Sequence, residues 1–468
     1  MALRFRSPRP RRVLRGVKAR RRTELGLLVA AAAIIVAAYT LMILGNTSRV
    51  PNDVVPLLVF MLVLGAVAHV ANRIFVPDAV AVVLPIAFLL NGLGYVFILR
   101  IDLGTRSNYA PLQASWTAAG VAAYVVTLMF IRRSRDLDRY RNLMLAGGVV
   151  LLLLPLVPHF GANINGARLW VRVGHFQFQP VELAKILLCV FFASYFAEKR
   201  EILTIPTARL GNRLFLDPRP LVPIVLAWGF AIAVMSLEHD IGFSALLFTL
   251  FIGLLWVTTG RTGYLIFGIV LFAIGAYIAA KYFSQTHVRI ETWLNPWHYI
   301  SPRDAGAQLR EAWYAMGSGG IGGQGLGLGF GAYSIYTPNT DFIFAVIANE
   351  MGLLGASMIV VAYLVLAGTG FRIAQAARSE FAKLVATALT IIIGFQAFFI
   401  IGGVVRLLPL TGITLPFVSY GGSALIANYV LIALLMRISD EGSAAVDESE
   451  RVQFEQDEER RERLLAGT

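Results

Sequence analysis

Long apolar segments constrain this chain more than any other feature of its sequence. Runs of roughly 18 or more residues with few or no charges recur along most of its 468 residues, and a helix of that length spans the hydrocarbon core of a bilayer. Hydrophobic residues make up 57% of the sequence and charged residues 15%. The sequence therefore predicts an all-α fold, a polytopic membrane helical bundle.

About twelve transmembrane helices are expected. The connections between them are alternately rich and poor in arginine and lysine. The connections at 132–141, 199–219 and 372–383 are rich in arginine and lysine, so the positive-inside rule assigns them to the cytoplasm. Both termini are then cytoplasmic, and residues 283–340 form a large extracellular loop. The predicted spans are 25–45, 54–72, 79–99, 113–131, 143–160, 182–197, 221–237, 243–259, 264–282, 342–367, 383–404 and 419–437.

Charged segments flank the predicted membrane domain of residues 25–437. Residues 1–24 are a basic cytoplasmic arm with one acid, and residues 438–468 are an acidic cytoplasmic tail. The net charge of +13 is concentrated in the arm and the short connections, where topology requires it, so no nucleic-acid partner is expected. The single cysteine, Cys189, lies in an apolar run and predicts a small buried side chain rather than a disulfide or metal site.

A glycine-rich stretch precedes the span at 342–367. Nine glycines fall between Gly317 and Gly331, and glycine permits positive φ and close backbone approach. Asp341 stands at the threshold of the following helix, and Glu350 lies deeper in it. Ionisable groups at membrane depth are costly and are candidate functional groups. For Asp341, capping of the helix that starts at 342 is a second interpretation.

Further charged residues border the predicted outer connections. Arg168 lies in the first, at 160–181, and Glu182 and Lys185 follow it at an i, i+3 spacing that allows them to pair or to line one cavity. Asp240 sits in a tight turn, where it can cap a helix or belong to a site. Arg310 and Arg406 add positive charge, the latter before a proline-rich stretch of irregular backbone.

Two interpretations of these charges remain open from the residues alone. Carboxylates and cations converging at the outer face of a bundle fit an enzyme acting on a phosphorylated, lipid-anchored substrate, with a base nearby. They fit an ion or lipid transporter almost as well.

Several motifs in a fixed order resemble one family. NGARLW, FQPVELAKI, HDIG, NPW, AMGSGGIGGQGLG, NTDFIFAVIANEMGLLG and LPLTGITLPFVSYGGSALI are similar to the SEDS family of bacterial cell-wall glycosyltransferases, RodA and FtsW. The resemblance runs from about residue 79 to 439, and the stretch LLNGLGYVFILRID at 89–102 is most like RodA proteins of actinobacteria. Members usually have ten spans, so the helices at 25–72 are two extra ones at the N-terminus.

The resemblance implies peptidoglycan synthesis in the bacterial cytoplasmic membrane, for cell elongation and shape. The substrate is lipid II, a disaccharide-pentapeptide on undecaprenyl pyrophosphate, and the implied partner is a class B penicillin-binding protein. The family's essential aspartate matches Asp341, expected to be a general base. Matches to the family's other motif positions make Glu182, Lys185, Asp240 and Glu350 expected substrate-binding residues.

Positive charge at the leaving pyrophosphate is expected from Lys185, Arg168, Arg310 or Arg406, or from a divalent cation, the one cofactor considered; no metal-binding residues are predicted. Two functions of other classes remain alternatives. One is a lipid II flippase, which needs no base, and the other is a non-enzymatic scaffold for a penicillin-binding transpeptidase.

Overall fold

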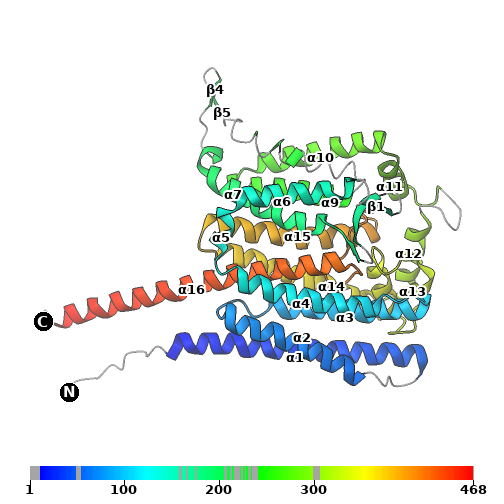
Figure 1. The fold of residues 1–468 in the computed structure, drawn as a ribbon, viewed down its shortest axis with the longest axis horizontal. Helices are drawn as coiled ribbons and strands as arrows, with labels where there is room; N and C mark the ends of the chain where they lie inside the picture. Colours follow the sequence, from blue (N-terminus) through cyan, green and yellow to red (C-terminus); the bar gives the residue numbers. More distant parts are fainter. Residues whose placement is uncertain are drawn as a thin grey trace.

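The computed structural model is a bundle of long helices (Figure 1). It describes the chain except residues 1–10, 49–53, 158–160, 165–166, 174–175, 205–207, 211–212, 216–221, 223–224, 227, 230–232, 234–240, 299–305 and 467–468. Within the described residues, nine helices are long and apolar enough to cross a bilayer. They are α1 (Arg11–Thr47), α2 (Val54–Phe75), α3 (Val83–Thr105), α4 (Ala110–Phe130), α9 (Ile241–Thr259), α10 (Thr262–Tyr282), α14 (Ile343–Gln375), α15 (Glu380–Val404) and α16 (Gly422–Ala466). The predicted polytopic helical bundle is confirmed.

The remaining three predicted spans differ from these nine. The span expected at 143–160 is a shorter helix, α6 (Arg141–Leu153), followed by the 3₁₀ turn η1 (Leu154–Leu156). The span expected at 182–197 is α7 (Val181–Thr204), which is longer and carries charged residues at both ends. The span expected at 221–237 falls mostly outside the described residues, so the count of twelve stays a prediction.

The two chain ends emerge at the same end of the bundle. In Figure 1, α1 begins and α16 ends on the left, together with α5 (Ser134–Arg139). The helices of the 283–340 connection, α11 (Ser284–Leu294), α12 (Ala307–Gly319) and α13 (Gly331–Ser334), lie at the opposite end. This arrangement agrees with the predicted alternation of connections, whereas the orientation in a membrane stays a prediction.

Two small sheets interrupt the helical fold. The strands β1 (Gly161–Ile164), β2 (Ala167–Val173) and β3 (Phe176–Phe178) form an antiparallel sheet in the first long connection. The strands β4 (Ala208–Leu210) and β5 (Arg213–Phe215) form a hairpin elsewhere. Neither sheet was predicted from the sequence, because short strands in a connection carry little of the periodicity that marks longer elements.

The helices at both ends of the chain extend past their predicted boundaries. α1 starts at Arg11 and α16 continues to Ala466 without a break, so neither the arm nor the tail is separated from its span. Arg21 and Glu24, at the end of the predicted basic arm, are 6% and 0% exposed. Their burial is possible because they pair with each other, Arg21 NH1 lying 2.9 Å from Glu24 Oε2.

α14 is broken at one glycine, and the glycine-rich loop fills the break. Gly352 has φ 66° and ψ −167° inside the helix, a conformation open almost only to glycine. The loop amides of Gln324 and Gly325 donate to the carbonyls of Asn349 and Glu350 at 3.0 Å each. The predicted loop shaped by its backbone is therefore confirmed, and it packs directly on the first turns of α14.

Candidate active site

The connection between α15 and α16, residues 405–421, organises the candidate site. Its backbone is irregular, with positive φ at Arg406 (65°), Gly412 (77°) and Phe417 (67°). Hydrogen bonds tie it to α11, to α15 and to the segment before α14. Irregular backbone of this kind is tolerated near a bilayer where protein covers it or where it lines a cavity.

Asp341 lies beside this connection and is partly exposed. The Ser419 hydroxyl donates to the Thr340 carbonyl at 2.6 Å, and the Tyr420 amide donates to the Asn339 carbonyl at 2.9 Å. The N-cap of α14 is Phe342, without a side-chain capping bond. The interpretation of Asp341 as the helix cap is therefore wrong, and within the described residues no hydrogen bond engages its carboxylate.

The surroundings of Asp341 favour its protonated form. Desolvation by nearby protein raises the pKa of the Asp341 carboxyl from 3.8 to about 6, and the positive charge of Arg289 opposes this rise. Arg289 itself donates from NH1 to the Thr411 carbonyl at 2.7 Å. A carboxylate with a pKa near the working pH can accept a proton from a substrate hydroxyl.

Replacement of Ser419 by alanine is expected to loosen the segment that carries Asp341. Besides its bond to Thr340, the buried Ser419 hydroxyl accepts from the Leu415 amide at 3.0 Å. Its removal leaves that amide unpaired, at a cost of about 1–3 kcal/mol. Amide exchange measured by mass spectrometry should rise at residues 339–342 and 415. Unchanged exchange in both segments would contradict this coupling.

Lys185 and Glu182 form the predicted pair. The Lys185 Nζ lies 2.5 Å from Glu182 Oε2 and 3.0 Å from Gln396 Oε1, and both charged side chains are almost fully buried. The Gln396 amide in turn donates to the Thr414 carbonyl at 2.8 Å. Lys185 is therefore linked to the 405–421 connection through one side chain, and its contact with a substrate stays a prediction.

Glu350 is held by an arginine that was not among the predicted site residues. Arg100 Nε, from α3, lies 2.7 Å from Glu350 Oε1, and the Gly327 amide donates to Glu350 Oε2 at 2.8 Å. Arg100 also donates to the Gly329 carbonyl at 2.7 Å. Both carboxylate oxygens are thus engaged in fixing the glycine-rich loop, and the contact of Glu350 with substrate stays a prediction.

The guanidinium groups of Arg310 and Arg406 also bind backbone. Arg406 donates to the Trp293 carbonyl at 3.0 Å and to the Leu294 carbonyl at 2.9 Å, at the C-terminal end of α11. Arg310 donates to the Pro296 carbonyl. Both arginines thus bind the chain at residues 293–296, and their role at the leaving pyrophosphate stays a prediction.

The side chains of two predicted site residues lie outside the part of the chain that the structure describes. Asp240 lies outside the described residues, and Arg168 is placed only by the backbone of β2, with its side chain outside them. Among the residues that are described, no three His, Cys, Asp or Glu side chains group to hold a metal ion. A divalent cation therefore stays an untested expectation.

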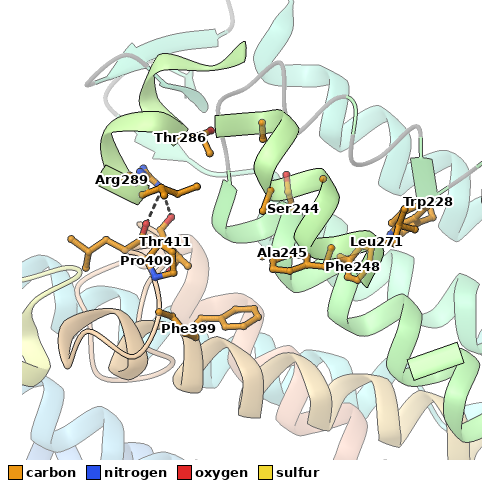
Figure 2. A pocket seen from close by; sticks show the side chains of 17 residues that line it. Trp228, Ser244, Ala245, Phe248, Leu271, Thr286, Arg289, Phe399, Pro409 and Thr411 are labelled. Carbon is orange, nitrogen blue, oxygen red and sulfur yellow. Dashed lines mark hydrogen bonds between the residues drawn. The ribbon is translucent and has the colours of Figure 1, made fainter. Parts of the chain in front are cut away.

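An elongated cavity of about 420 Å³ opens beside Arg289 (Figure 2). Arg289, Thr286 and Thr411 lie at one end, and Trp228, Phe248 and Leu271 lie at the other. Its remaining walls come mainly from α9, α10, α15 and residues 408–410, and most of them are apolar. A charged end and a long apolar wall suit an amphiphile with an anionic head.

Comparisons with known proteins agree with this architecture. The chain is 38% identical over 427 residues to the peptidoglycan glycosyltransferase RodA of Mycobacterium tuberculosis, covering 90% of each chain. It is 30% identical to the probable peptidoglycan glycosyltransferase FtsW of Geobacter metallireducens, covering 77% of this chain and 94% of that one.

Solved structures share the fold. The rod shape determining protein RodA of Thermus thermophilus matches with a TM-score of 0.54 at 23% identity, covering 76% of this chain and 95% of that one. A chain from a study of a peptidoglycan synthase complex, titled as coordinating polymerization and crosslinking, matches with a TM-score of 0.61 at 22% identity. It covers 77% of this chain and 97% of that chain.

The match to a whole family extends over most of the membrane domain. The sequence model of the FtsW, RodA and SpoVE family, described as cell cycle proteins, matches residues 80–444. This range contains Asp341, the glycine-rich loop and the 405–421 connection, and it leaves out α1 and α2. The chain is therefore a multi-pass membrane protein that belongs to the FtsW/RodA/SpoVE family.

Proposed function

We propose that this protein is a peptidoglycan glycosyltransferase that joins lipid II units into glycan strands, with Asp341 as the general base. One observation carries the proposal. A partly exposed carboxylate with a pKa of about 6 lies on a segment bound to the 405–421 connection, and the same connection binds Arg289, which lines the charged end of an apolar cavity. The curated RodA relatives named as peptidoglycan glycosyltransferases support the activity.

The chemistry assigns a role to each part of this arrangement. Asp341 removes the proton from the acceptor's sugar hydroxyl, whose oxygen attacks the anomeric carbon of the donor with inversion. The bond from that carbon to the pyrophosphate oxygen breaks, and the lipid pyrophosphate leaves with the electron pair. Arg289 offsets the negative charge that develops on the leaving group, and the apolar cavity receives part of the lipid chain.

The membrane setting follows from the same proposal. The protein resides in the bacterial cytoplasmic membrane with the 283–340 connection outside and both termini inside, and it serves elongation and cell shape. A transpeptidase partner of the class B penicillin-binding type is supported by the solved synthase complex, which is titled as coordinating polymerization with crosslinking.

The pH dependence of the reaction should follow Asp341. Because the pKa of its carboxyl is about 6, kcat/KM should fall roughly tenfold per pH unit below that value, as the base becomes protonated. Arg289 lowers this pKa, so an Arg289→Gln variant should move the acid limb to higher pH. Initial rates of polymerisation between pH 4.5 and 8 measure the acid limb of each protein. An acid limb that is the same in both proteins would exclude Asp341 as its source.

The decisive experiment uses the purified full-length protein with purified lipid II, alone and with its transpeptidase. Glycan polymer resolved on gels is the expected product. Absence of polymer in both conditions, together with translocation of fluorescent lipid II across liposome membranes, would support the flippase alternative. Absence of both activities would leave the scaffold alternative.

A further inference from the structure

The first helix touches the glycine-rich loop, although it lies outside the region that matches the family. A methyl group placed on Gly45 of α1 would lie 2.2 Å from the Leu326 carbonyl oxygen. A methyl group placed on Gly327 would lie 2.1 Å from the Met42 carbonyl oxygen and 2.9 Å from the Asn46 amide nitrogen. Backbone therefore packs on backbone at this point, and the contact requires glycine on both sides.

The loop is clamped from its other face by the core of the bundle. Gly327 has φ +81° and donates its amide to Glu350, which Arg100 holds. Gly327 thus lies between α1 on one side and the Glu350–Arg100 pair on the other. From there the chain passes through α13 to Asp341, so the loop and the start of α14 together fix where that carboxylate lies.

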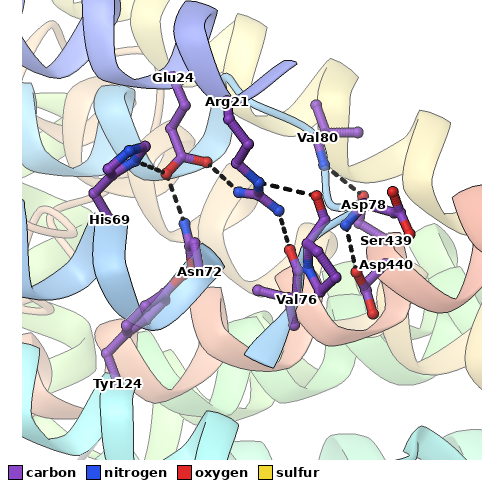
Figure 3. Close-up of polar contacts among 11 residues, drawn as sticks. Arg21, Glu24, His69, Asn72, Val76, Asp78, Val80, Tyr124, Ser439 and Asp440 are labelled. Carbon is purple, nitrogen blue, oxygen red and sulfur yellow. Dashed lines mark hydrogen bonds and ion pairs between the residues drawn. The ribbon is translucent and has the colours of Figure 1, made fainter. Parts of the chain in front are cut away.

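A buried polar network anchors α1 at its opposite end (Figure 3). Glu24 Oε1 lies 2.7 Å from His69 Nδ1 and accepts from the Asn72 amide at 3.2 Å, and Tyr124 donates to Asn72. Arg21 donates to the Pro77 carbonyl at 2.9 Å. A buried network in which charges are paired resists displacement, because a lost partner leaves a desolvated charge.

The turn that receives Arg21 is also held by the last helix. The amides of Asp78 and Val80 donate to Asp440 at 2.7 Å and to Ser439 at 3.0 Å, and Figure 3 shows these contacts beside those of Arg21. The position of α1 is thus fixed at one end by α2, α4 and α16, and at the other by the glycine-rich loop. A helix held in this way acts as a rigid support along its length.

We propose that α1 is a positioning element for the Asp341 segment and that Gly45 is the residue through which it acts. The inference rests on the proposed glycosyltransferase function. A loop with this many glycines has a large conformational entropy to lose, and its backbone groups cannot be left facing lipid. The end of α1 covers the loop at Gly327. It limits the conformations that the loop can adopt, and so the positions that Asp341 can take.

The test compares two glycines of the same helix. Gly45→Ala and Gly45→Leu place a side chain against the Leu326 carbonyl, whereas Gly26→Ala and Gly26→Leu form a matched control, because a Cβ there meets nothing within 4 Å. Displacement of the loop by about an ångström should lower kcat of Gly45→Leu about 10²-fold. KM for lipid II should change much less, because the apolar cavity is built by other helices.

Amide exchange provides a readout independent of turnover. Exchange at residues 320–330 and 339–342 should accelerate in the Gly45 variants, while α15 and the thermal unfolding midpoint should match those of the Gly26 variants. Native kcat and native exchange in both Gly45 variants would overturn the proposal. So would a loss explained by the amount of folded protein, with kcat per folded molecule unchanged.

The two proposals fail in different ways. If the unmodified protein makes no polymer, the proposed function fails, and the exchange measurement still decides whether α1 positions the loop. If the unmodified protein polymerises lipid II and the Gly45 variants keep its kcat and exchange, the proposed function stands and the role of α1 is rejected.

Discussion

An Asp341→Asn protein is expected to polymerise lipid II roughly 10²–10⁴-fold more slowly than the unmodified protein. Asparagine keeps the shape of the side chain but cannot accept the hydroxyl proton. The substitution should leave the helix intact, because Phe342 and not Asp341 is the N-cap of α14. Single-turnover polymerisation of lipid II measures the chemical step separately from product release.

Stability provides the control for this variant. The pKa of Asp341 is raised from 3.8 to about 6 in the folded protein, so its carboxyl favours folding at low pH, and that contribution is lost as the pH rises through 6. At neutral pH, asparagine should therefore unfold at the same temperature or slightly higher. Asp136→Asn, the same change at an exposed site in α5, should leave both rate and stability unchanged. Full activity of Asp341→Asn would remove the general base from the mechanism.

The second large effect concerns the Arg100–Glu350 ion pair that holds the glycine-rich loop. Arg100→Ala leaves Glu350 buried without its ion-pair partner, and breaking a buried pair in this way costs about 3–5 kcal/mol. The loss should be visible in denaturant or thermal unfolding of the purified protein in detergent, with activity falling alongside it. The pair's side chains are 4% and 0% exposed, so solvent cannot replace the missing partner.

An exposed ion pair in the same protein supplies the comparison. Arg141 contacts Glu198 with side chains that are 36% and 40% exposed, and Arg141→Ala should cost no more than about 1 kcal/mol. Equal losses for Arg100→Ala and Arg141→Ala would mean that Glu350 finds another partner. A smaller loss in the Arg100→Met/Glu350→Met double variant than in Arg100→Ala would identify the unpaired charge as the cause.

The membrane fold was predictable because its main signal is local. Apolar length alone located the spans, and nine of them coincide with described helices of the required length. The burial of Arg21 and Glu24 was not predictable in this way, because a charge count says nothing of which charged side chains are buried. Only tertiary contacts with His69 and with the turn at 76–77 reveal that they are buried.

The site was predictable only where its signal is local in the sequence. Asp341 and the glycine-rich loop stand out in the sequence, and the Glu182–Lys185 pair follows from helical spacing. Arg100 lies just past the predicted span at 79–99, and its partner is 250 residues away, so no local pattern marked it. Arg289 lay among many charged residues of the 283–340 connection, and nothing local distinguished it from Arg310.

The break at Gly352 makes the length of the helix between Asp341 and Gly352 more important than the identity of its side chains. Between Asp341 and the break, the chain makes a short helix whose far end is locked by the loop. Each residue of an α-helix advances about 100° and 1.5 Å. One inserted residue in this helix would swing Asp341 about a quarter turn away from Arg289 while the locked end stayed in place. An insertion or deletion in this helix is therefore expected to lower activity more than a change of apolar side chain that keeps its length.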